Sequence, residues 1–347
     1  MPFTRQFALV FACSIILFGC AGEAVIPEPE PDIIAFVARN PTTRITALYT
    51  SEIDGKNLEL ISPITTLTSS RIAVTQGGRF LFFSGKGGSE LPLVLFNVST
   101  GQLTMMGQAT AVFPTVSPDG SRLIWFETTG GQFSLVMCKS DGTERTVLVD
   151  GTAFGRPLRV EAAPSWSPDG TMIAFSAIDT TSRNTVGPIP HVITLATRTI
   201  ARFRTSDFVG APQFLANDTL IYVSSERIPY SLKRYALSTG VDSTITSALP
   251  ALNSTILSIS PDRSTVVCIN PLTIVDLKTA RVFVKTTNDA VIHNQMWSPN
   301  GNSFIYGDRT PNTLYSERLY HLSKRGEQLP LVNLDTIGSS ASVVWLR

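Results

Sequence analysis

The sequence predicts an all-β protein, a seven-bladed β-propeller, with a six-bladed ring as the alternative. The first observation is a turn phrase followed by a short apolar strand, "SWSPDGTMIAFSA" at 165–177, which returns several times along the chain. The second is the regular spacing of the copies. The third is the composition, because 24 Gly and 22 Pro among 347 residues indicate many tight turns and few long helices.

The copies of this phrase recur at the spacing of propeller blades. Clear copies begin at Pro114, Leu257 and Gln295, and weaker ones begin at Ile72 and Ala211. They and the last strand-like segment share one position, occupied by Val74, Val116, Trp166, Phe214, Ile259, Trp297 and Trp345. Subtracting successive numbers gives steps of 42, 50, 48, 45, 38 and 48 residues. A four-stranded blade spans roughly 40 to 50 residues, so each step corresponds to one blade.

Each repeat contains the signals for four strands. Proline fixes φ and glycine permits positive φ, so the Ser-Pro-Asp-Gly phrase predicts a tight turn between the first and second strands. A third strand follows and ends in a second turn, at 51–55, 97–101, 139–143, 236–240 and 323–327. Short apolar runs such as "LELIS" and "TVLV" then supply the fourth strand.

The two ends of the repeat region complement each other. The segment from Asp32, "DIIAFVARN", matches a second strand and has no first strand before it. The segment 342–346, "SVVWL", matches a first strand with no second strand after it. We therefore predict that 342–346 completes the first blade, which closes the ring and removes the exposed sheet edges of an open fan.

The Pro-x-Trp-Ser-Pro-Asp-Gly phrase at 164–175 and the run "SLVMCKSDGTERTVL" at 134–148 resemble the WD40-like Pro-Asp repeat of the TolB propeller domain. The same repeat is found in the propellers of prolyl oligopeptidase-type peptidases and of oligogalacturonate lyase. The resemblance covers about residues 33–347 and implies the propeller fold. The second and fifth blades depart from the pattern, and Cys138 stands where the family has a polar residue. Function does not follow from this fold, because propellers host both binding and catalysis.

The N-terminal residues predict an anchored protein of the cell envelope. Residues 1–19 have one early positive charge and an apolar run, which is typical of a secretory signal peptide. The sequence "LFGC" at 17–20 resembles the lipobox of bacterial lipoproteins, so we predict lipidation of Cys20, with ordinary signal cleavage nearby as the alternative. Residues 20–32 form a Pro/Glu-rich tether. Alanine after Cys20 indicates the outer membrane, facing the periplasm or the cell surface, and the lipid is the only predicted membrane contact.

Charge and cysteine content exclude some partners. The chain has 28 basic and 27 acidic residues, a formal net charge of +1, and this balance does not indicate nucleic acid as a partner. Cys138 and Cys268 fall in blades far apart around the ring. We therefore expect both to be buried and neither to form a disulfide.

No catalytic constellation is evident. His293 opens a first strand near the predicted axis, so we include it among the predicted binding residues. The metal site of the oligogalacturonate lyases needs more histidines than this chain brings to one place, so we predict no metal and no cofactor. His321 is expected to pack within a blade. Asp119, Asp169 and Asp262 share one turn position in different blades, so we interpret them as turn residues. Trp125 and the tryptophans of the repeat position are expected to be core residues.

Two long neighbouring connections predict a binding rim. They run from Asp150 to Ala163, entering the fourth blade, and from Ile178 to His191, within it. The alternative is that they are only tolerated insertions. Loops held by a rigid scaffold are common binding sites. The rim residues and the axial histidine make up the predicted binding set: Phe154, Arg156, Arg159, Glu161, Arg183, Asn184 and His293.

Two functions of different classes follow. The favoured one is a non-catalytic, membrane-anchored scaffold that binds a protein or peptide in the cell envelope, which is the role that the TolB resemblance implies. A cationic rim with an aromatic residue would suit an acidic peptide or a glycan. The alternative is a hydrolase or lyase that acts on a saccharide or lactone in the axial channel.

Overall fold

The structure covers most of the predicted propeller. The computed structural model describes residues 32–39, 46–63, 70–75, 80–85, 93–106, 110–129, 132–152, 160, 162–177, 189–203, 208–224, 228–250, 257–268, 271–284, 290–291, 297–308, 318–329, 331 and 339–346. The chain divides into two compact units, Met1–Pro31 and Asp32–Arg347, and all described residues belong to the second.

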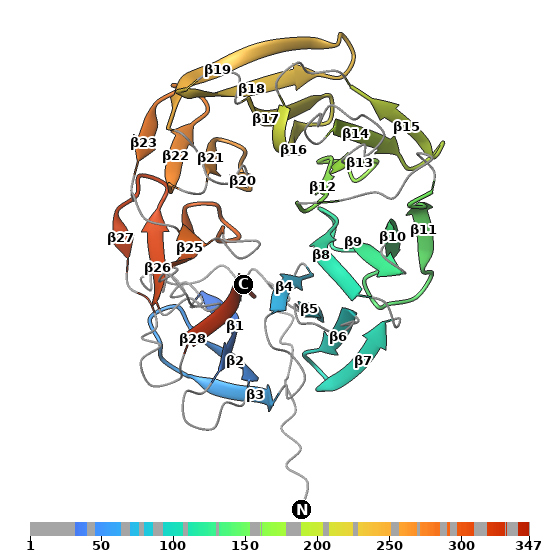
Figure 1. Cartoon of the computed structure of the whole chain (residues 1–347). Helices are drawn as coiled ribbons and strands as arrows, with labels where there is room; N and C mark the ends of the chain where they lie inside the picture. Colours follow the sequence, from blue (N-terminus) through green and yellow to red (C-terminus); the bar gives the residue numbers. More distant parts are fainter. Residues whose placement is uncertain are drawn as a thin grey trace, which may run out of the picture. The chain divides into compact units, whose positions relative to one another are not determined.

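Among the described residues there are seven four-stranded antiparallel sheets, one for each predicted blade. Figure 1 shows them arranged in a ring in chain order, with the labelled first strands nearest the centre. Blade 1 consists of β28 (Ser339–Trp345), β1 (Ile33–Arg39), β2 (Thr46–Glu52) and β3 (Glu59–Pro63). Blade 2 consists of β4 (Ser70–Val74), β5 (Phe80–Gly85), β6 (Leu93–Asn97) and β7 (Gln102–Met106). The all-β propeller prediction is confirmed.

The remaining blades follow the same order of strands. Blade 3 has β8 (Thr110–Val116), β9 (Arg122–Thr129), β10 (Gln132–Lys139) and β11 (Thr146–Val149), and blade 4 has β12 (Ser165–Trp166), β13 (Met172–Ala177), β14 (Ile189–Thr194) and β15 (Thr199–Arg202). Blade 5 has β16 (Phe208–Ala216), β17 (Thr219–Ser224), β18 (Tyr230–Ala236) and β19 (Val241–Leu249). Blade 6 has β20 (Leu257–Ile259), β21 (Thr265–Cys268), β22 (Thr273–Asp276) and β23 (Val282–Val284). Blade 7 has β24 (Ala290–Val291), β25 (Ser303–Asp308), β26 (Arg318–Ser323) and β27 (Gln328–Leu329).

The ring closes as predicted from the two ends of the chain. β28 pairs with β1 in antiparallel register, with Ile34 opposite Trp345 and Phe36 opposite Val343. The observed strand starts three residues earlier than the predicted 342–346 and contains one irregularity of register, next to Val37. The C-terminus therefore supplies the innermost strand of the N-terminal blade (Figure 1).

The core lies between the blades. The described residues form seven buried hydrophobic clusters, and each combines side chains of two neighbouring blades. Side chains alternate along a strand, so one strand serves two clusters. In β1, Ile34 and Phe36 pack toward blade 7, whereas Ala35 and Val37 pack toward blade 2. This explains why the second strand of each blade is an almost unbroken apolar run.

The tryptophans of the repeat position are core residues, as expected. Trp166, Trp297 and Trp345 are all buried in the clusters between blades. The indole Nε1 of Trp166 also donates a hydrogen bond of 3.2 Å to the backbone oxygen of Thr115 in blade 3. Trp125, in β9, is fully buried between blades 2 and 3. These side chains hold adjacent blades together.

The Ser-Pro-Asp phrase forms the predicted turn between the first and second strands of a blade, which we call the first turn. In blade 4, Gly170 has a φ of 68° and its backbone N donates to the Ser167 oxygen at 2.9 Å. Blade 6 has Arg263 at the corresponding place, with a φ of 58°. The Arg263 guanidinium donates to the backbone oxygens of Phe214 and Leu215 in blade 5, at 2.9 and 3.1 Å. A contact with the neighbouring blade thus accompanies the unfavourable backbone conformation.

The cysteines and two of the histidines are also interior. Cys138 and Cys268 are free thiols in blades 3 and 6, and burial raises the pKa of each to about 12. Both are therefore protonated at neutral pH. His191 stacks on Phe175, with ring centroids 5.3 Å apart. His321 lies edge-on to Trp345 at 5.5 Å, which confirms its packing role.

Candidate functional site

The predicted binding residues lie outside the described residues. This applies to Cys20, to the rim residues Phe154, Arg156, Arg159, Glu161, Arg183 and Asn184, and to His293. The flanking strands are described: one rim connection joins β11 to β12, and the other joins β13 to β14. Because β12 and β13 are antiparallel, both connections attach at the same edge of blade 4, opposite its first turn. The rim itself stays a prediction.

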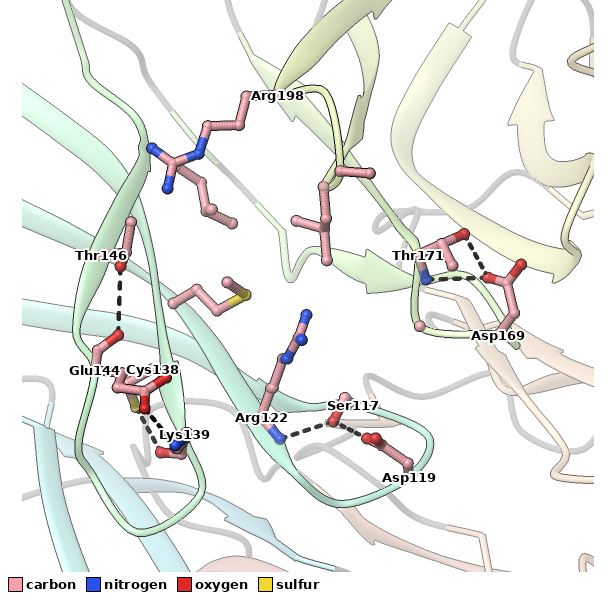
Figure 2. A pocket seen from close by; sticks show the side chains of 15 residues that line it. Ser117, Asp119, Arg122, Cys138, Lys139, Glu144, Thr146, Asp169, Thr171 and Arg198 are labelled. Atoms are coloured by element: carbon pink, nitrogen blue, oxygen red, sulfur yellow. Dashed lines mark hydrogen bonds and ion pairs between the residues drawn. The ribbon is translucent and has the colours of Figure 1, made fainter.

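The structure reveals a pocket at the other edge of blades 3 and 4. Its volume is about 550 Å³, and its walls are the first and second turns of blade 3 and both turns of blade 4 (Figure 2). The second turn of a blade joins its third and fourth strands. The lining residues are Ser117, Asp119, Arg122, Met137, Cys138, Lys139, Glu144, Thr146, Leu148, Asp169, Gly170, Thr171, Leu195, Ala196 and Arg198. Three basic and three acidic side chains are among them.

A comparison with blades 6 and 7 shows an ion pair between blades that the pocket lacks. Lys324, in the second turn of blade 7, contacts the Asp262 carboxylate in the first turn of blade 6 and lies 3.1 Å from Ser264 Oγ. The backbone N of Lys324 donates to the Asn302 oxygen, as the backbone N of Leu195 donates to the Thr171 oxygen. Leu195 therefore stands at the position equivalent to Lys324, as Leu237 does in blade 5 and Leu277 in blade 6. An isobutyl group cannot bond a carboxylate, so no such bridge to blade 3 forms there.

The pocket carboxylates are engaged within their own turns. Asp119 accepts hydrogen bonds from Ser117 Oγ at 2.5 Å, from Ser121 Oγ at 2.6 Å and from Ser121 N at 3.1 Å. The hydrogen bonds from Ser117 and Ser121 lower the pKa of Asp119 to about 2. Asp169 accepts equivalent bonds from Ser167 and Thr171, and its pKa is also lowered. Both carboxylates are thus ionised at neutral pH, and their hydrogen bonds within the turns confirm their interpretation as turn residues.

The Asp119 turn predicts a measurable dependence of stability on pH. The carboxyl has a pKa of about 3.9 in an unfolded chain, and folding lowers it. Its stabilising contribution is therefore complete above that value and is lost as the pH falls from about 4 to 2. Asp119→Asn should flatten this part of the profile of unfolding free energy against pH, measured by urea denaturation.

The chain offers a matched control for this prediction. Asn300 occupies the same place in blade 7 and accepts from Ser298 Oγ at 2.8 Å and from Asn302 N at 2.9 Å, so an amide supports the turn. Asn300→Asp should steepen the acid limb by the same mechanism. An unchanged acid limb in Asp119→Asn would show that the hydrogen bonds of this turn do not depend on charge.

The arginines are the charged groups of the pocket that remain available to a ligand. Lys139 is paired with Glu144 in the second turn of blade 3. Arg122, at the start of β9, extends into the middle of the pocket, and Arg198 reaches over it from the second turn of blade 4 (Figure 2). Within the described part of the chain, neither guanidinium forms an ion pair. Each guanidinium presents N–H donors in a planar fork that suits a carboxylate or phosphate.

Apolar side chains form the other part of the lining. Met137, Leu148 and Leu195 are partly buried and pack against the hydrophobic cluster between blades 3 and 4. The pocket therefore combines an apolar floor with two cationic groups. The sequence did not predict it, because its residues belong to turns that look alike from blade to blade.

Two further observations concern metals and membranes. Among the residues that the structure describes, no group of three or more His, Cys, Asp or Glu side chains could hold a metal ion. The same residues contain no helix of the length and apolarity that crossing a membrane requires.

Comparisons with known proteins bear on the fold. No protein-family model matches the sequence, and no curated protein matches it. Among solved structures, TolB from Acinetobacter baumannii is similar, with a TM-score of 0.52, 17% identity, and coverage of 91% of this chain and 66% of that protein. An oligogalacturonate lyase in complex with manganese has a TM-score of 0.60 at 15% identity, covering 87% of this chain and 84% of the lyase.

A puromycin-hydrolyzing peptidase of Mycobacterium tuberculosis is also similar, with a TM-score of 0.63 and 13% identity. The match covers 89% of this chain and 53% of the peptidase. Similarity at these identities establishes the shared propeller and no common function. The expected TolB-like propeller fold is confirmed.

Proposed function

We propose that this chain is an anchored propeller of the bacterial cell envelope that binds a protein or peptide partner and catalyses no reaction. The observation that carries the proposal is the pocket between blades 3 and 4. Its carboxylates Asp119 and Asp169 are held by Ser and Thr donors, whereas Arg122 and Arg198 face the same space without an ion pair among the described residues. Such a pocket suits binding of an anionic group better than acid–base chemistry.

The proposed attachment to the envelope rests on the N-terminal sequence. Residues 1–19 would be the signal peptide, Cys20 the lipidated residue and 20–32 the tether that holds the propeller away from the outer membrane. The lipid would be the only membrane contact. The propeller could then hold a partner near the membrane without having a transmembrane segment of its own.

The test is affinity capture from crosslinked, detergent-solubilised envelopes with intact protein and three variants. One variant removes the predicted rim charges (Arg156→Ser, Arg159→Ser and Arg183→Ser), one removes the pocket charges (Arg122→Gln and Arg198→Gln), and Arg202→Gln is the control. Arg202 is an exposed cation on β15. We expect a partner that is recovered with the intact protein and the control and falls by about tenfold in one of the other variants, a loss of about 1.4 kcal/mol. Equal background recovery by all four proteins would contradict the scaffold function.

A separate experiment tests the alternative that the protein is a hydrolase or lyase. A hydrolase or lyase site in the axial channel would use His293, and the lyase similarity shows only the shared fold. Turnover of a saccharide or of a lactone that is lost in His293→Ala would favour it over the scaffold.

A further inference from the structure

The junction of blades 3 and 4 lacks the ion pair found between blades 6 and 7 and contains a pocket. At the latter, the Lys324 ammonium of one blade meets the Asp262 carboxylate of the other. At the former, Leu195 replaces the lysine, Asp119 is satisfied by its own turn, and a pocket of about 550 Å³ remains. That volume lies within the roughly 300 to 1,000 Å³ of sites that bind small ligands or side chains.

We infer that this pocket binds a carboxylate group next to an apolar side chain, as in an acidic segment of a peptide. The inference rests on the proposed binding function and names the chemistry of the ligand. Arg122 and Arg198 would receive the carboxylate, and Met137, Leu148 and Leu195 would contact the apolar group.

The guanidinium groups favour an anion. Arg122 projects into the pocket from β9, and Arg198 reaches over it from the opposite turn (Figure 2). Lys139 is not available in the same way, because its ammonium is paired with Glu144. Charge-assisted hydrogen bonds from a planar guanidinium fork to a carboxylate are among the stronger polar contacts in proteins.

The acidic residues favour a carboxylate over a phosphate. Asp119 and Asp169 line the same pocket and are ionised at neutral pH, because Ser and Thr donors stabilise their charged forms. A phosphate monoester, with its charge of about −1.5 to −2, would be repelled by both to a greater degree than a singly charged carboxylate. The apolar floor in turn favours a ligand with a hydrocarbon group next to the charge.

The experiment measures peptide binding to the full-length protein in detergent by fluorescence anisotropy. The probe is a short labelled peptide with one glutamate between two leucines, amidated at its C-terminus. Matched probes replace the glutamate by glutamine, replace it by phosphoserine, or carry the only carboxylate at the C-terminus. We expect the glutamine probe to bind at least about tenfold more weakly, and the phosphoserine probe also to bind more weakly. The C-terminal probe shows which source of carboxylate is preferred.

The variants locate the site. Arg122→Gln and Arg198→Gln should each weaken binding of the glutamate probe about fivefold or more. Arg202→Gln, in the same blade as Arg198, should leave binding unchanged. Leu195→Lys copies the blade 7 arrangement, so its ammonium should reach Asp119 and close the pocket, which should abolish binding. Thermal melts verify that each variant is folded. The two arginine variants keep the test decisive if Leu195→Lys does not fold.

Three results would overturn the inference: no binding of any carboxylate probe, equal binding of the glutamate and glutamine probes, or wild-type affinity in both arginine variants. Failure of the inference differs from failure of the proposed function. One outcome separates the two: the double variant Arg122→Gln/Arg198→Gln still captures the envelope partner while the rim variant does not. In that case the scaffold function stands and this pocket is not its site.

Discussion

Removing residues 339–347 is expected to abolish the cooperative unfolding transition of the protein. These residues contain β28, whose Val343, Val344 and Trp345 are buried in the clusters on either side of blade 1. Burial of a large apolar side chain contributes roughly 1.5 to 3 kcal/mol, so three such losses approach the roughly 5 to 15 kcal/mol of a typical folded protein. The truncation also exposes the backbone edge of β1, which favours aggregation. Urea denaturation followed by tryptophan fluorescence, with size-exclusion chromatography, measures both effects.

A synthetic peptide with the sequence of 339–347 provides the control for this truncation. Added in excess, it should pair with β1 and restore a transition whose midpoint depends on peptide concentration. If the truncated chain unfolds with the same midpoint and slope as the intact protein, closure by β28 does not stabilise the ring.

Phe175→Ala should lower the free energy of unfolding by about 3 to 5 kcal/mol. Phe175 is fully buried in the cluster between blades 3 and 4, edge-on to Phe126 at 6.3 Å and stacked on His191. The substitution leaves a cavity between two sheets that other clusters hold in place, so collapse around it is limited. The midpoint of urea denaturation gives the size of the effect.

Phe283→Ala is the matched control, since the same atoms are removed from a side chain that is 42% exposed on β23. Its expected effect is about 0.5 kcal/mol or less. Similar losses in the two variants would contradict the view that stability resides in the clusters between blades.

The blade pattern could be predicted because its signals are local. A Ser-Pro-Asp-Gly turn is specified by backbone preferences of a few adjacent residues, and each repeat carries one or a degenerate version of it. The repeat position was located correctly: Val116 pairs with Leu123, Trp166 with Ile173 and Trp297 with Phe304. Ring closure followed from counting strands, because the first blade lacked one strand and the chain end supplied one.

The pocket could not be predicted in the same way. Its walls come from Asp119 of one blade and Leu195 of the next, and these turns meet only because the ring sets two sheets side by side. Arg263 at a position that favours glycine was also unexpected from local preferences, since a contact with blade 5 accompanies it. Features that depend on contacts between two blades cannot be predicted from the sequence of a single repeat.

Closure of blade 1 by β28 also constrains the order of events in folding. The pairing of Ile34 with Trp345 joins residues 311 positions apart, by subtraction, whereas the other sheets pair strands that are close in sequence. Blades 2 to 7 can therefore form successively as the chain is synthesised, but blade 1 has to wait for the last residues. Contacts over such separations are slow to form, and the waiting edge of β1 is open to other chains meanwhile. The time spent with an unclosed ring, more than the stability of the closed one, should then govern the yield of folded protein.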